Sequence, residues 1–195
     1  SIEPNLKEGQ TLLFAHGYNI HYKLINPPEF INIVLASPSG SGTELRKRYS
    51  QGIGIPGLIA VDQDYSGNSF EVLKSYCKAI GLTRVGVFKS TFKEETETDL
   101  FGEQVVLTGG IPKLLQAAYN VLLESNVSPV AAWLVCYYEL KTIVDLFHSK
   151  GFEFMNKAIS DTAEYGGITR GNRIIDENVR NEMRLILKEI QDGSF

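Results

Sequence analysis

The sequence is poor in features that mark disulfide-built or nucleic-acid-binding proteins. Only two of its 195 residues are cysteines. Cys77 and Cys136 lie in apolar helical patterns without metal-ligand spacing, so we expect buried free thiols in a reducing compartment. The formal net charge of −4 provides no basic surface for nucleic acid, and we expect no nucleic-acid partner.

Long apolar runs are also absent. The longest, residues 129–138, covers about half of the ~20 residues that a membrane-spanning helix needs. The first residues lack the charged and apolar regions of a secretory signal. Hydrophobic residues make up 43% and charged residues 22% of the chain, which is ordinary for a globular protein. We therefore expect a cytoplasmic protein without a membrane partner.

What is present suggests two domains. Residues 1–90 alternate short β-branched runs with helical patterns, which predicts a parallel sheet covered by helices. The expected strands are 11–15, 31–36, 58–61 and 85–88, and the expected helices are 44–49 and 69–80. Residues 91–195 have no convincing strand and predict an all-α domain, with helices at 97–108, 112–125, 129–149, 152–160 and 176–191.

The α/β part lacks the usual opening of a dinucleotide-binding domain. That opening is a strand followed by Gly-x-Gly-x-x-Gly and a helix, whose backbone N–H groups hold a pyrophosphate. Gly40-Ser41-Gly42 is too short a match. The sequence thus predicts only part of a Rossmann-like domain.

Acidic residues are concentrated just after the boundary between the two parts. Five fall within positions 94–103, and Asp99 and Glu103 are four residues apart. On a helix these two would share one face, where a hard cation such as Mg²⁺ or Ca²⁺ would relieve their repulsion. The alternative is an acid-rich first helical turn favoured by the helix dipole. Spacing alone leaves both interpretations open.

Four segments together resemble the ketol-acid reductoisomerase family. They are FAHGYNIHY (14–22), TFKEETETDLFGEQ (91–104), YELKTIVDL (138–146) and ISDTAEYG (159–166). The resemblance implies a partial Rossmann-like domain in residues 1–90 and the family's knotted helical domain in residues 91–195. It also implies that the family's N-terminal segment with the Gly-rich turn, and its last helices, are absent from this chain.

The family moves an alkyl group within a 2-acetohydroxy acid and reduces the resulting ketone with NADPH, in the biosynthesis of valine, leucine and isoleucine. The resemblance implies that two Mg²⁺ ions assist the first step. Asp99 matches the acid that bridges both ions, and Glu103 matches a second ligand of one. Glu139 matches a ligand of the other ion, supplied across a homodimer by the partner chain.

Three further residues match functional positions of the family. His16 matches its active-site histidine, Ser160 its substrate-binding serine, and Gly42 a glycine at the nicotinamide end of the cofactor. The residues alone allow other roles. His16 could hold its loop by hydrogen bonds, Gly42 could serve a turn, and Glu139 could be a helix acid that is solvated or paired with Lys141.

The sequence departs from the family pattern at three positions. Val135 stands where a second glutamate is expected, four residues before Glu139, and valine cannot coordinate a cation. Ser39 replaces a lysine, and Asp161 replaces an asparagine. Each change alters the charge available to metal, cofactor or substrate.

These observations leave competing interpretations. The first is a ketol-acid reductoisomerase, weakened or represented by a fragment. The second is a non-catalytic relative that acts only in dimerisation or ligand binding. A third, a Mg²⁺-dependent lyase or isomerase without nicotinamide, fits the residues but has no positive support.

Overall fold

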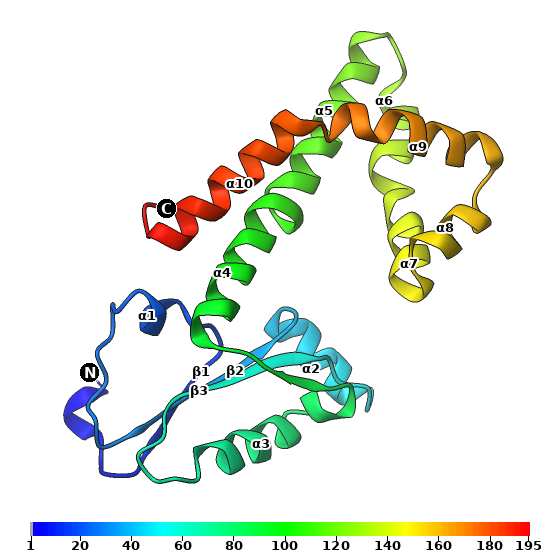
Figure 1. Cartoon of the computed structure of the whole chain (residues 1–195). Coiled ribbons are helices and arrows are strands. Elements are labelled where there is room, and N and C mark those ends of the chain that lie inside the picture. Colours follow the sequence, from blue (N-terminus) through cyan, green and yellow to red (C-terminus); the bar gives the residue numbers. More distant parts are fainter. Residues whose placement is uncertain (1) are drawn as a thin grey trace. The chain divides into compact units, whose positions relative to one another are not determined.

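A computed structural model describes residues 2–195. The chain divides into two compact units, the first ending at Leu100 and the second beginning at Phe101. Helix α4 (Phe92–Gly102) crosses this division, whereas the sequence places the domain boundary just before that helix. Figure 1 labels the α-helices of both units and the strands β1, β2 and β3.

The first unit is built on one sheet. Within residues 2–195 the sheet has four strands in the order β1-β2-β3-β4. Its elements are η1 (Glu3–Asn5), β1 (Thr11–Phe14), α1 (Tyr18–His21), β2 (Asn32–Pro38), α2 (Gly42–Ser50), β3 (Gly57–Gln63), α3 (Ser69–Ala79), η2 (Leu82–Arg84), β4 (Val87–Lys89) and the start of α4.

Strand β2 is the centre of the core because it is buried on both faces. Val34 and Ala36 pack with Leu73 and Cys77 of α3 on one face. Helix α3 lies below the sheet in Figure 1. Ile33, Leu35 and the adjacent Ile31 pack with Phe92 of α4 on the other. Alternate residues of a strand point to opposite faces, so this apolar run supplies both layers.

The expected all-parallel sheet is wrong at one pairing. β1 pairs with β2 and β3 with β4 in parallel, but β2 and β3 are antiparallel, with Pro38 opposite Gly57. A parallel return requires a crossover that packs across the sheet. No residue of α2, which lies in this connection, is buried. Residues 39–56 therefore turn the chain back at the end of the sheet, and the sheet is mixed.

The loop before β3 contains the letters Gly-x-Gly-x-x-Gly at residues 52–57. Here the stretch leaves a helix and enters a strand, which is the reverse of the dinucleotide-binding order. A Cβ on Gly54 would lie 2.3 Å from the carbonyl oxygen of Gly81, and one on Gly57 would lie 2.7 Å from that of Ser37. Close backbone packing explains both glycines.

The second unit, residues 101–195, contains helices joined by short turns and no strand, and the structure describes all of these residues. Its elements are the end of α4, then η3 (Glu103–Leu107), α5 (Gly110–Glu124), α6 (Pro129–Trp133), η4 (Leu134–Tyr138), α7 (Leu140–Lys150), α8 (Phe152–Ala158), α9 (Asp161–Ile174) and α10 (Glu177–Asp192). None of the helices in residues 2–195 combines the length and the apolar character that crossing a bilayer requires.

Two helices of this unit differ from the sequence-based expectation. The single helix expected over 129–149 is interrupted by the π-helical turn η4. Helix α9 was not expected, because Gly166, Gly167 and Gly171 lower the helix propensity of that stretch. Its start is nevertheless fixed by Ser160, whose Oγ accepts a hydrogen bond from the Ala163 N–H.

Candidate functional site

The candidate site begins at the carboxyl end of β1. His16 follows this strand by two residues, and the next element, α1, starts at Tyr18. Ligands in sheets of this kind bind beyond the carboxyl ends of the strands. The carboxyl end of β1 thus places an imidazole where chemistry is expected.

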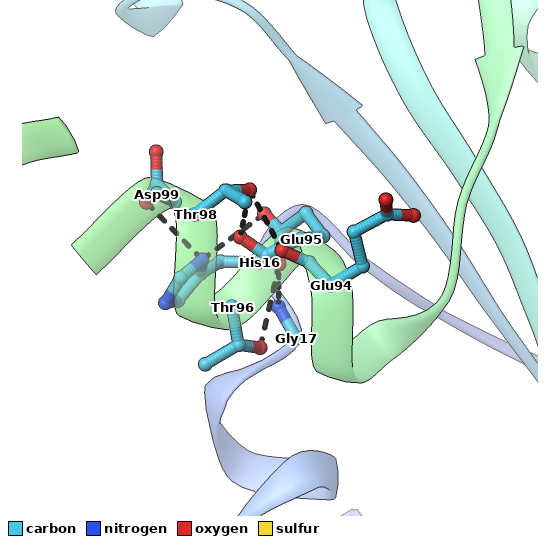
Figure 2. A network of polar contacts seen from close by, with 7 residues as sticks. All are labelled: His16, Gly17, Glu94, Glu95, Thr96, Thr98 and Asp99. Atoms are coloured by element: carbon cyan, nitrogen blue, oxygen red, sulfur yellow. Dashed lines mark hydrogen bonds and ion pairs between the residues drawn. The ribbon is translucent and has the colours of Figure 1, made fainter. Parts of the chain in front are cut away.

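Two carboxylates of α4 face this imidazole. The His16 Nδ1 atom lies 3.1 Å from Oε1 of Glu95 and 3.3 Å from Oδ2 of Asp99. The Glu95 side chain is 2% exposed, whereas those of His16 and Asp99 are 35% and 48% exposed. Figure 2 shows the three side chains converging from the β1–α1 loop and from α4. The structure therefore brings together two residues predicted from sequence, His16 and Asp99.

Glu95 is a site residue that the sequence interpretation missed. Its Oε2 accepts a 2.7 Å hydrogen bond from the backbone N–H of Gly17, and its Oε1 faces His16. A signal was present, because Glu95 and Asp99 are four residues apart, just as Asp99 and Glu103 are. The sequence interpretation favoured the second pair because it matched the family's metal ligands.

Gly17 lets the histidine loop approach α4 closely. A Cβ at this position would lie 2.5 Å from Oγ1 of Thr96 and 2.7 Å from the carbonyl oxygen of Phe92. The φ angle of Gly17 is −82°, so contact, not backbone conformation, requires glycine. The imidazole is thus held against α4 by backbone packing as well as by the carboxylates.

A second polar contact anchors α1 beside the site. His21 Nε2 lies 3.6 Å from Oε1 of Glu97, and Lys93 Nζ lies 3.8 Å from the same oxygen. The Glu97 side chain is only 9% exposed. Burial of the Tyr22 phenol is the main cause that raises its pKa, and the nearby charge of Glu97 raises this pKa further. Consecutive turns of α4 thus hold both ends of the His16–His21 segment.

The cluster at His16 offers one nitrogen and two oxygen donors. One ligand atom from each of His16, Glu95 and Asp99 lies within 4.8 Å of the others. Such a group can hold a proton between imidazole and carboxylate, or a cation in its place. The carboxylate oxygens are the donors that Mg²⁺ prefers.

Two other predicted metal ligands lie in the second unit. Glu103 is the first residue of the π-helical turn η3 and is exposed. Glu139 is exposed between η4 and α7, and its backbone N–H bonds to the carbonyl of Leu134. The assignment of both acids to a metal stays a prediction.

The remaining predicted residues have local structural roles. Ser160 caps α9, as described above, and is exposed. Gly42 is the first residue of α2, and a Cβ there would meet nothing within 4 Å. Neither observation tests substrate or cofactor binding, so both assignments remain predictions.

Comparison with known families covers both units. The family described as "Acetohydroxy acid isomeroreductase, NADPH-binding domain" matches residues 1–86. The family described as "Ketol-acid reductoisomerase, C-terminal domain" matches residues 92–195. Residues 87–91, which hold β4 and the turn into α4, lie between the two matches.

Curated relatives agree with these matches. Ketol-acid reductoisomerase (NADP(+)) from Methanocaldococcus jannaschii is 53% identical over 194 residues, which is 100% of this chain and 59% of the relative. The protein of the same name from Methanococcus maripaludis is 50% identical over the same shares. The chain therefore spans about three fifths of the length of these relatives.

Solved structures support the same fold. A NADH-preferring ketol-acid reductoisomerase from an uncultured archean superposes with a TM-score of 0.97 at 43% identity, covering 100% of this chain and 59% of that one. A semialdehyde dehydrogenase NAD-binding protein from Cupriavidus necator, at 14% identity, 98% and 71% coverage and a TM-score of 0.63, shares the fold alone. On the strength of its two domain matches, the chain belongs to the ketol-acid reductoisomerase family.

Proposed function

We propose that this chain carries the metal-binding and proton-handling part of a ketol-acid reductoisomerase. The reaction would be the Mg²⁺-dependent alkyl migration within a 2-acetohydroxy acid, followed by reduction with NADPH, in branched-chain amino-acid biosynthesis. The observation that supports this most is the pairing of His16 with Asp99, in a chain whose two units match the family's two domains.

The donor set fits Mg²⁺ at Asp99. Its side chain is 48% exposed, so water can complete the coordination of a hard cation that takes one or two carboxylates. Glu103 would be the second ligand, and Glu139 of a partner subunit would contribute to a second ion. The ions would polarise substrate oxygens and fix the substrate for the migration.

His16 and Glu95 would handle the proton and the geometry. Glu95 is fixed by the Gly17 N–H, so it orients the imidazole and keeps it beside Asp99. The partly exposed ring of His16 can then exchange a proton with a substrate hydroxyl that lies next to Asp99. Ser160 would bind the substrate, with the carboxylate of Asp161 beside it opposing a negatively charged ligand.

The proposed function also involves a nicotinamide cofactor and a homodimer. The family binds a nicotinamide cofactor, and Gly42 would lie at its nicotinamide end. The two units would act as a cytoplasmic homodimer, with an active site shared between chains. Because Ser39 and Val135 replace a lysine and a glutamate, we propose that turnover by this chain is slow.

A non-catalytic role in dimerisation or ligand binding is the alternative. It is favoured by the same two substitutions, which remove charge from the site. It predicts that restoring the charge does not create activity.

One experiment separates the two. The 195-residue chain is incubated with a 2-acetohydroxy acid, Mg²⁺ and NADPH or NADH, and the rearranged and the reduced products are quantified separately. Slow formation of either product, raised in the Ser39→Lys, Val135→Glu double variant and lost in Asp99→Ala, supports the proposal. No product from the chain and from the double variant, with both folded, supports the non-catalytic role.

A further inference from the structure

The His16 cluster has a ligand set that differs from a Mg²⁺ site. We propose that His16, Glu95 and Asp99 form a three-ligand site for a borderline divalent metal ion such as Zn²⁺ or Co²⁺. The site uses an imidazole nitrogen and two carboxylate oxygens. It shares Asp99 with the Mg²⁺ site proposed above but requires neither Glu103 nor Glu139, and its use of His16 and Glu95 distinguishes the two sites.

The distances between the donor atoms suit such an ion. At metal–ligand distances of about 2.1 Å, neighbouring ligand atoms are about 3.0 Å apart in octahedral and about 3.4 Å apart in tetrahedral geometry. The two measured separations from Nδ1 of His16, 3.1 Å to Glu95 and 3.3 Å to Asp99, fall in this interval. The third separation, between the ligand oxygens of Glu95 and Asp99, is within 4.8 Å, so modest side-chain movement would close the three atoms on an ion.

The ligands are also oriented in advance. The Gly17 N–H holds one oxygen of Glu95 and turns the other toward the imidazole. Hydrogen bonds of this kind to a ligating carboxylate strengthen metal binding. The partial exposure of His16 and Asp99 provides an entry path and leaves room for water as a further ligand.

The choice of metal follows from the nitrogen donor. Imidazole favours Zn²⁺, Co²⁺ and other transition ions, whereas Mg²⁺ binds oxygen donors. A proton on Nδ1 fits the same distances, and it competes with the metal for the cluster. The alternative is thus a hydrogen-bonded trio that holds a proton and no metal.

Titration of the 195-residue chain with Zn²⁺ in competition with a chromophoric chelator tests the site. His16→Gln should weaken Zn²⁺ binding at least about tenfold, as loss of a ligand does at minimum, while leaving Mg²⁺ affinity unchanged. His148→Gln is the matched control, because this histidine is exposed in the last turn of α7. Asp99→Asn should weaken Zn²⁺ binding similarly, and its control Glu94→Gln should not.

Two further measurements test whether Zn²⁺ binds at His16 or elsewhere on the chain. Cys136→Ser should keep the affinity, which excludes the partly exposed thiol as the ligand. In the unaltered chain, Zn²⁺ should shift the imidazole nitrogen resonances of His16 and leave those of His148 in place. An unshifted His16 resonance, or equal loss of Zn²⁺ affinity in His16→Gln and His148→Gln, would overturn the proposal.

Discussion

Glu95 links α4 to the β1–α1 loop through a single carboxylate. One oxygen accepts the Gly17 N–H, and the other faces the His16 imidazole. A buried carboxylate is stable only when its oxygens are satisfied, and these two contacts meet that requirement. The arrangement therefore couples the stability of the loop to the orientation of the histidine.

Val135 is the residue on which the metal stoichiometry depends. Its side chain is 57% exposed in the second unit and offers no ligand, so the second Mg²⁺ would lack one carboxylate. Two divalent ions about 4 Å apart repel by about 17 kcal/mol at an effective dielectric near 20, before the charges of their ligands are counted. We expect at most one Mg²⁺ per chain, a count that rises toward two in Val135→Glu, as measured by isothermal titration calorimetry.

Asp99→Ala controls this prediction and should abolish Mg²⁺ binding, because both ions would share that carboxylate. Two Mg²⁺ bound per unaltered chain at sub-millimolar concentration would show that this interpretation of Val135 is incorrect.

Some residues of the site could be predicted from the sequence, and others could not. His16 and Asp99 were predicted because each lies within a long motif of the family. Glu95 was missed because spacing alone gave it the same weight as any helix acid, and only the position of the Gly17 N–H distinguishes it. Contacts between residues 78 positions apart do not follow from local patterns.

At the scale of elements, the close packing of the β1–α1 loop on α4 depends on Gly17. In Gly17→Ala the methyl group would meet the Phe92 carbonyl oxygen at 2.7 Å, and a backbone oxygen in a helix cannot move away. Overpacking of this kind destabilises by about 1–3 kcal/mol. We expect a lower urea midpoint of unfolding and a weaker metal affinity.

Gly42→Ala is the matched control for Gly17→Ala. A Cβ at Gly42 meets nothing within 4 Å, and alanine favours a helix over glycine. Its midpoint of unfolding should stay level or rise. Equal losses in the two variants would contradict the proposed contact.

The contact between α1 and α4 also involves a mostly buried histidine and a buried carboxylate. His21 and Glu97 are 17% and 9% exposed and 3.6 Å apart. Lys93, which is 68% exposed, lies 3.8 Å from the same Glu97 oxygen, so altering His21 leaves this buried carboxylate beside a more exposed cation. We expect the effects of His21→Gln and Glu97→Gln to be non-additive by about 0.5–3 kcal/mol. Urea unfolding of both single variants and the double variant measures this.

Lys157 and Glu153 of α8 provide the comparison cycle. They form an exposed pair, with side chains 73% and 83% accessible, and pairs of this kind couple weakly. The Lys157→Gln and Glu153→Gln effects should therefore add. Additive effects at His21 and Glu97 would show that their contact does not hold α1.

The elements themselves were predicted better than their arrangement. All four strands and most helices follow from apolar periodicity and turn residues. Strand β2 is an example, because its continuous apolar run predicts the burial that its residues show. The antiparallel pairing of β2 with β3 was not predictable, because periodicity does not reveal whether α2 crosses the sheet. The π turns η3 and η4 were likewise invisible to a 3.6-residue period.

At the scale of the whole molecule, the second unit exposes much apolar surface. Helix α6 and the turn η4 carry several such side chains, with exposed fractions of 69% for Val130, 48% for Trp133, 57% for Val135 and 66% for Tyr138. Apolar patches of this kind mark protein interfaces. We expect the chain to form a homodimer through residues 91–195, which multi-angle light scattering at micromolar concentration should detect.

Val130→Glu places a charge in this patch and should shift the molar mass toward that of one chain. Thr142→Glu, at an exposed position of α7, is the control and should leave the dimer intact. A one-chain mass for the unaltered protein would contradict the expected assembly.

The cofactor prediction concerns the 195-residue chain as a unit. Three backbone N–H groups in and just after the glycine-rich turn between β2 and α2 already have hydrogen-bond partners. The N–H groups of Ser39 and Gly40 bond to the carbonyls of Pro56 and Pro38, and Ser41 Oγ accepts the Glu44 N–H. A pyrophosphate needs such groups to be available at a strand-to-helix turn.

In the other glycine-rich stretch, residues 52–57, Gly54 and Gly57 pack closely against the backbone of other segments. We therefore expect this chain alone to bind NADPH weakly, with a Kd above about 1 mM, corresponding to less than about 4 kcal/mol of binding free energy. Calorimetric titration with NADPH and, as the matched ligand, NADH measures this. Saturable binding of either nucleotide at micromolar concentration would show that a phosphate site exists that neither glycine-rich stretch supplies.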